Sequence, residues 1–114
     1  MDNKRNLKRR ELVYNPKIYD ADADEPAGYL VDVNAQGIRI SGTRTFSVGE
    51  QLDLAIDLPE DILGRKKVRF SARVQWSKPD LNPDLVATGM QFSSIPPADL
   101  ETLIGLMARY SMTQ

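Results

Sequence analysis

Two groups of residues could together bind a guanine nucleotide. The first is a basic cluster close to the N-terminus, formed by Lys4, Arg5, Lys8, Arg9 and Arg10. Arginine side chains offer planar guanidinium forks that bind a phosphate or a guanine edge bidentately and can stack on a base. The second is a turn in which Asp32 and Asn34 offer acceptors for the ring and amino protons of a guanine, while Gly37 lets the backbone pass close.

Each group also has an ordinary structural interpretation. Residues 1–10 carry five Lys or Arg against one acid, a net charge of +4, and the rest of the chain carries ten basic and fifteen acidic residues, a net −5. Such a basic segment can be a solubilising tail. Asp, Asn and Gly are likewise common in tight turns between strands for conformational reasons.

Most catalytic and metal chemistry lacks the residues it needs. The chain has no cysteine and no histidine, and it contains no glycine-rich phosphate loop. The acidic stretch of residues 20–24 resembles the start of a calcium loop, but Glu25 stands where that loop requires glycine and Val31 where it requires glutamate. We therefore expect a solvated acidic hairpin loop, no metal, no cofactor and no enzymatic activity.

Composition predicts one soluble globular domain. The chain has 114 residues, of which 41% are hydrophobic and 27% charged, and its net charge of −1 predicts no general affinity for nucleic acid or anionic membranes. No apolar run reaches the roughly 18–20 residues that span a bilayer, and no signal peptide is evident, so a cytoplasmic location is expected. We expect a flexible basic arm over residues 1–11 and a single domain over 12–114.

Alternating apolar and polar residues predict a small β-structure. The clearest strands run from residue 51 to Pro59, which should end the strand, and from 67 to 77, where Trp76 continues the apolar face. In the strand that begins at residue 51, Ala55 is predicted to lie on the solvent-exposed face. Weaker strands are predicted at 12–20, 28–34, 37–41 and 86–93, with loops at 21–28, 42–50, 59–66 and 77–84.

One helix is predicted at the end of the chain. Pro97 suits the first turn of a helix, and Asp99 and Glu101 suit its dipole. Apolar residues then recur at helical spacing, at positions 100, 103, 104, 107 and 110. The sequence therefore predicts an all-β fold of six strands with a helix over about 97–110 that covers the barrel.

The order of these features resembles the PilZ domain family. The family pattern is a basic stretch of form RxxxR, followed some twenty residues later by a turn of form [D/N]xSxxG; the similarity continues through Gly37-Ile38-Arg39-Ile40, Ala72-Arg73-Val74-Gln75-Trp76, Gly89-Met90-Gln91-Phe92 and the final helix. The resemblance implies a six-stranded antiparallel split β-barrel with one C-terminal helix. It also implies binding of cyclic di-GMP through Arg9, with Arg10 adjacent, and through Asp32 and Gly37.

Two residues depart from the family pattern. If Arg9 opens the RxxxR motif, its second arginine falls on Val13, and the serine of the turn falls on Asn34. Losing one charge-assisted contact costs roughly 1.5–3 kcal/mol. A shifted register, in which Arg5 and Arg9 form the motif, would avoid that loss. Two hypotheses follow: a receptor that relays cyclic di-GMP to an unidentified output protein, or a degenerate domain that no longer binds the nucleotide and acts as a protein-interaction module.

Overall fold

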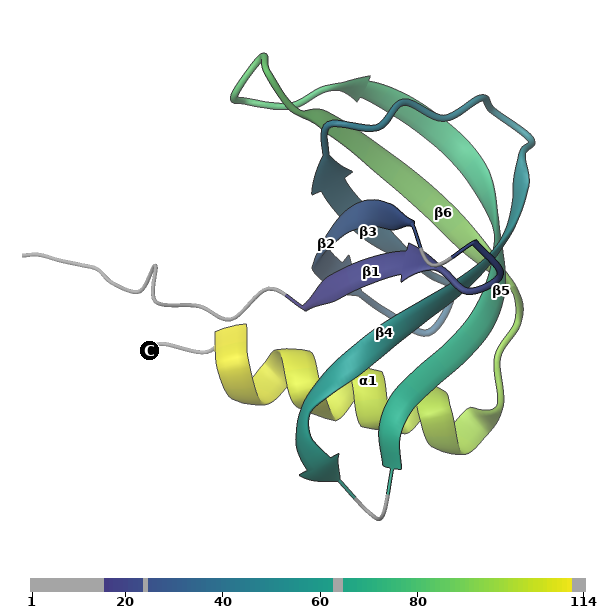
Figure 1. The fold of residues 1–114 in the computed structure, drawn as a ribbon, viewed down its shortest axis with the longest axis vertical. Coiled ribbons are helices and arrows are strands. Elements are labelled where there is room, and N and C mark those ends of the chain that lie inside the picture. Colours follow the sequence, from purple (N-terminus) through teal and green to yellow (C-terminus); the bar gives the residue numbers. More distant parts are fainter. Residues whose placement is uncertain (1–15, 24, 63–64, 112–114) are drawn as a thin grey trace, which may run out of the picture.

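The structure is a computed structural model that describes residues 16–23, 25–62 and 65–111. Six antiparallel strands form a closed barrel in the order β1-β2-β3-β6-β5-β4, and one helix follows them (Figure 1). The elements are β1 (Lys17–Asp20), β2 (Pro26–Val33), β3 (Gly37–Gly42), β4 (Gln51–Ile62), β5 (Arg65–Pro79), β6 (Val86–Ser94) and α1 (Pro97–Ser111). The predicted six-stranded barrel with one C-terminal helix is confirmed.

The short strand β1 closes the barrel. It pairs with β2 on one side and with β4 on the other, and the pairing with β2 shifts between Ile18 and Tyr19. Pro16 is buried just before the strand, and its carbonyl oxygen accepts a hydrogen bond from the backbone N–H of Leu30 (2.8 Å). The shift in pairing thus begins two residues beyond this proline. The first residues of the predicted strand, 12–15, lie outside the described residues.

Period-2 alternation builds the core of the barrel. Strands β4 and β5 contribute apolar side chains to this core, all buried as expected: Leu52, Leu54, Ile56, Leu58, Val68, Phe70, Ala72 and Val74. Ala55 departs from the prediction of a wet position, since only 1% of its surface is exposed. It lies between Tyr19 of β1 and Arg69 of β5 in the sheet, and its methyl group is shorter than both neighbouring side chains. The two longer neighbouring side chains therefore shield Ala55 from solvent, although it lies on the outer face of the sheet.

Two predicted strand boundaries are wrong. Pro59 does not end β4, which continues to Ile62, and β5 already begins at Arg65 and continues to Pro79. The regular pairing of β4 with β5 stops at Asp57 and resumes at Ile62. A proline has no N–H to donate to the ladder, so it interrupts the pairing without ending the extended backbone.

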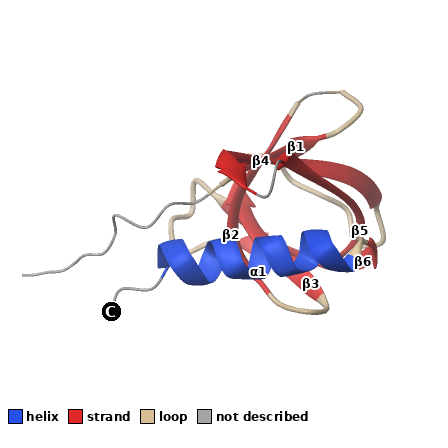
Figure 2. Cartoon of the chain, turned by 90° about the horizontal axis from the view of Figure 1, so that it is seen from below, coloured by secondary structure: helices blue, strands red, loops and turns tan. Residues whose placement is uncertain are grey.

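Helix α1 lies across one end of the barrel (Figure 2). It contributes Leu103, Leu106 and Met107 to the core. Ile104, which the helical spacing placed on the buried stripe, is 38% exposed, because the buried face is centred on residues 103, 106 and 107. Among the described residues, no helix is long and apolar enough to cross a membrane.

The acidic segment after β1 forms a tight turn between β1 and β2. Asp20 Oδ1 accepts hydrogen bonds from the backbone N–H groups of Asp22 (2.9 Å) and Ala23 (3.1 Å), and these bonds lower the pKa of Asp20. Asp22 forms an exposed ion pair with Arg69 of β5 (3.2 Å). Within the described ranges, no three acidic residues are grouped so as to hold a metal ion.

Candidate functional site

Two irregularities in the strands place side chains on the outer face of the barrel. The pairing of β2 with β3 shifts between Leu30 and Asp32, and the pairing of β5 with β6 shifts between Val74 and Trp76. Each shift inserts one extra residue, which reverses the alternation of the strand beyond it. Leu30 and Val74 point into the core, so without the shifts Asp32 and Trp76 would point inward as well.

Four residues on neighbouring strands consequently lie in one row across the sheet. Asp32 of β2 is opposite Arg39 of β3, Arg39 is opposite Gly89 of β6, and Gly89 is opposite Trp76 of β5. Residues that are directly opposite in a sheet share one face. The row therefore presents a carboxylate, a guanidinium and an indole on the same outer surface. We call these four residues the transverse row.

Trp76 lies against the glycine of this row. A Cβ atom on Gly89 would be only 2.3 Å from Nε1 of the indole, so the ring occupies the space that any side chain at this position would need. Trp76 is 38% exposed, and Lys78 Nζ lies 5.2 Å from its ring centroid. The expectation that Trp76 extends the core face of its strand is wrong, because the shift after Val74 moves it to the outside.

The transverse row lines a hollow of about 420 Å³. Asp32, Arg39 and Trp76 form part of its wall together with the turn between β2 and β3, including Asn34 and Gly37. Three of the residues proposed from sequence are thus brought together in one hollow: Asp32, Asn34 and Gly37. Arg39 and Trp76 were not among the proposed site residues.

Asn34 organises the turn from within. Its Oδ1 atom accepts hydrogen bonds from the backbone N–H groups of Gln36 (2.8 Å) and Gly37 (3.1 Å), and its own N–H donates to the carbonyl of Gly37 (3.0 Å). Both lone pairs of the side-chain oxygen are therefore used inside the turn, and the amide NH₂ is left as the group that can meet a ligand. A serine hydroxyl forms the same kind of turn more weakly.

The neighbouring strand β6 leaves no room for a side chain at Gly37. A Cβ atom here would be 2.0 Å from the carbonyl oxygen of Met90 on β6. The backbone N–H of Phe92 also donates to the carbonyl of Gln36 (2.9 Å), which ties the turn to β6. The close approach expected at Gly37 therefore occurs, and the backbone that approaches belongs to β6.

Asp32 lines this hollow, whereas Asp80 lies in a neighbouring part of the surface. Asp32 is exposed, and its Oδ1 accepts a hydrogen bond from the N–H of Val33 (2.9 Å). Asp80 follows β5 and binds Ser41 Oγ of β3 (2.6 Å). That hydrogen bond, a second one from the N–H of Leu81, and the charge of Arg39 lower the pKa of Asp80. Asp80 thus anchors the β5–β6 loop, while Asp32 is open to a ligand.

The remaining proposed residues, Arg5, Arg9 and Arg10, lie outside the described residues, as do Val13 and the boundary between the arm and the domain. Sequence could have indicated Arg39, because it alternates with the apolar residues Ile38 and Ile40 and therefore belongs to the outer face. Trp76 gave no such indication, since nothing in its strand shows where the alternation reverses.

Comparisons with known proteins agree with the fold. The structure of the Bacillus subtilis inhibitor of motility MotI/DgrA superposes with a TM-score of 0.66 at 21% sequence identity over 90% of this chain. The chain spans about half the length of that protein, 51%. A search of curated proteins finds no match. The family model of the PilZ domain matches residues 3–109, and the chain therefore belongs to the PilZ domain family.

Proposed function

We propose that this domain is a binding module for cyclic di-GMP that relays the nucleotide signal to a protein partner, in the cytoplasm and without enzymatic activity. The transverse row is the observation that carries the proposal. It combines an exposed carboxylate, a guanidinium and an indole in one hollow beside the turn that the family pattern specifies.

Each group of the row suits one part of the nucleotide. The carboxylate of Asp32 can accept the N1–H and amino protons of a guanine. The indole of Trp76 offers a flat face for stacking, a contact worth about 1–3 kcal/mol per base. Arg39 supplies a fork for a phosphate or for the O6/N7 edge of the guanine. In this proposal Arg5, Arg9 and Arg10 contribute further contacts to the phosphates, as the family resemblance implies.

Isothermal titration of the whole chain with cyclic di-GMP tests the proposal. We expect micromolar or tighter binding that Asp32→Ala and Arg9→Ala both weaken. Asp84→Ala is a matched control, since this exposed acid of the β5–β6 loop does not line the hollow. Cyclic di-AMP should bind far more weakly, because adenine has no N1–H to give to Asp32. No heat from cyclic di-GMP with the folded protein would refute the proposal.

A degenerate domain that binds only a protein is the second candidate. Val13 stands where the family pattern has its second arginine, and the Oδ1 of Asn34 is already used within the turn. If this candidate is correct, the wild-type chain gives no heat with cyclic di-GMP and Val13→Arg creates binding. Tight binding by the wild-type chain would exclude it. Control of motility is the output to test first, since the solved neighbour is titled an inhibitor of motility.

A further inference from the structure

A second hollow lies at the other end of the β2–β3 hairpin. Its volume is about 600 Å³, and β1, β2, β3 and the loops after β3 and β5 all contribute to its wall. On the hairpin it uses residues 26–31 and 41–44, whereas the hollow of the transverse row uses residues 32–39. The two hollows share no residue, although a third hollow of about 630 Å³ includes Arg39 and Trp76 of the first wall and Val31, Ser41 and Asp80 of the second.

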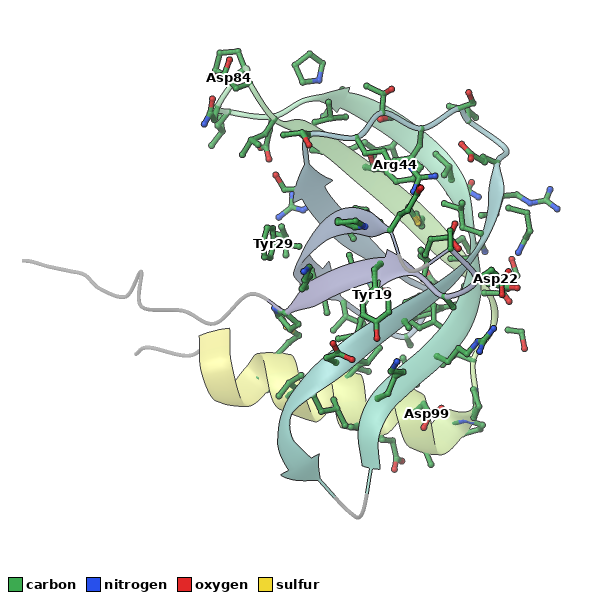
Figure 3. The ribbon with its side chains drawn as sticks, viewed as in Figure 1. Tyr19, Asp22, Tyr29, Arg44, Asp84 and Asp99 are labelled. Atoms are coloured by element: carbon green, nitrogen blue, oxygen red, sulfur yellow. The ribbon has the colours of Figure 1, made fainter. Side chains whose placement is uncertain are left out.

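Two glycines contribute backbone to the wall of this second hollow. Gly28 and Gly42 lie side by side on β2 and β3, and a Cβ atom on Gly42 would be 2.8 Å from the Cα of Gly28. Gly28 is opposite the buried Ile18 and two residues before the buried Leu30, so its missing side chain would face the core, and towards the hollow both glycines present backbone. The apolar side chains of Tyr29, Val31 and Leu85 lie beside this backbone, whereas Ala27 is part of the core. Tyr29 is 54% exposed and projects away from the ribbon (Figure 3). The hollow therefore suits an apolar group.

Arg44 supplies a fixed cation at this hollow (Figure 3). Its guanidinium carbon lies 4.7 Å from the centroid of the Phe46 ring, which holds the side chain in place. The Nη1 atom is buried from solvent and has no hydrogen-bond partner within the described part of the chain. Because Nη1 is covered by protein atoms, a ligand in the hollow would meet the other parts of the guanidinium, where Arg44 lines the wall.

Two acids near this hollow, Asp20 and Asp80, accept hydrogen bonds from other groups. The charge of Arg44 helps to lower the pKa of Asp20, but Oδ1 of Asp20 accepts hydrogen bonds from two N–H groups of its own turn. Asp80 lines the hollow and binds Ser41 Oγ through Oδ2 and the N–H of Leu81 through Oδ1 (2.7 Å). Neither acid forms an ion pair with Arg44 among the described residues. Lys17 adds a second cation to the wall.

From these observations we infer that the second hollow is a binding site for a small amphipathic acid. Its carboxylate accepts hydrogen bonds from Arg44, with Lys17 contributing positive charge, and its apolar body lies on the backbone of Gly28 and Gly42 against Tyr29. The site shares no residue with the hollow of the transverse row, so its occupation by an acid can be tested without the nucleotide.

Octanoate, used below its micelle-forming concentration, is a suitable probe, and 1-octanol is its uncharged counterpart. Two-dimensional ¹H–¹⁵N spectra of the labelled chain should show saturable shifts at residues 26–31 and 41–44 with octanoate. Arg44→Gln should weaken octanoate binding about 10- to 100-fold, as expected for loss of a charge-assisted contact, and leave octanol unaffected. Lys78→Gln is the matched control, since Lys78 lies on the outer face but does not line this hollow.

Tyr29→Ser distinguishes the apolar part of the site, since it should weaken both probes. The spectra themselves report whether each variant is folded. The inference is overturned if octanoate causes no saturable shifts in this region, if the shifts lie elsewhere, or if a folded Arg44→Gln protein binds octanoate as tightly as the wild type. A failure to bind cyclic di-GMP would leave the inference intact, so the two proposals fail separately.

Discussion

The indole of Trp76 occupies the space that a side chain on Gly89 would need: a Cβ atom there would be 2.3 Å from Trp76 Nε1 and Cε2. Gly89→Ala should therefore displace the indole from the sheet. We expect a loss of roughly 1–3 kcal/mol in the free energy of unfolding, typical of overpacking. Because Trp76 is the only tryptophan of the chain, its fluorescence emission should shift to the red as the ring becomes more exposed. Unchanged emission from the folded variant would contradict the contact.

Gly37 should tolerate alanine less well than Gly89 does. The Cβ atom at Gly37 would meet the carbonyl oxygen of Met90 at 2.0 Å, and this backbone atom cannot rotate away as a side chain can. The strands β3 and β6 would have to separate, at a cost of roughly 3 kcal/mol or more. Gly105→Ala is the control, since nothing lies within 4 Å of that position in α1 and alanine should stabilise the helix by about 0.5–1 kcal/mol. This account is wrong if Gly37→Ala, Gly89→Ala and Gly105→Ala change the free energy of unfolding in urea by the same amount.

Trp76 should also report nucleotide binding if the proposed function is correct. Cyclic di-GMP stacked on the indole should quench its fluorescence in a saturable way. Trp76→Ala should weaken binding about 10- to 100-fold, since base–aromatic stacking contributes about 1–3 kcal/mol, and Trp76→Phe should weaken it less. Val48→Ala is a suitable control, because Val48 is 71% exposed but does not line the hollow. If folded Trp76→Ala binds cyclic di-GMP with full affinity, the indole does not take part in nucleotide binding.

The fold was more predictable from sequence than the site, and the two irregularities in the strands explain why. Alternation over β4 and β5 fixes which residues face the core as long as the strand is regular, as for Leu54 and Phe70. An inserted residue reverses that alternation without changing the composition of the strand. Trp76 therefore has the sequence pattern of a core residue although it lies outside.

Asp32 was proposed as an acceptor within a turn and through a resemblance to a family pattern, and neither argument depended on knowing which way its side chain points. Arg39 follows regular alternation and could have been placed on the outer face from sequence. Neither residue could have been assigned to a row with Trp76, because that row depends on the order in which the strands pair. The apolar hollow at Gly28 and Gly42 likewise arises only when β2 and β3 lie side by side.

Asn34 should stabilise the turn through its side-chain oxygen. Asn34→Ala removes the acceptor of the N–H groups of Gln36 and Gly37, and we expect a loss of about 1–2 kcal/mol in the free energy of unfolding. Asn34→Ser should recover part of the loss, because a serine hydroxyl can accept from the same turn. Amide hydrogen exchange at Gln36 and Gly37 provides a local measurement. Equal exchange rates in Asn34→Ala and the wild type would show that the hydrogen bonds contribute nothing.

The hydrogen bond between Ser41 and Asp80 should make stability depend on pH in the acid range. Ser41 Oγ donates to Asp80 Oδ2 (2.6 Å) and is the largest of the causes that lower the pKa of Asp80 below its ordinary value of 3.8. Since the folded chain holds this proton less tightly than the unfolded chain does, the carboxylate contributes stability above about pH 3.8. That contribution is lost as the pH falls through the lower folded-state pKa.

Ser41→Ala should therefore be less stable than the wild type at neutral pH, and the difference should shrink as the pH falls below 3.8. Urea unfolding of both proteins across this range measures it. Asp80→Asn provides the control, because in that background Ser41→Ala should show no such acid dependence. A difference between wild type and Ser41→Ala that stays constant with pH would mean that the hydroxyl acts through packing and not through the charge of Asp80.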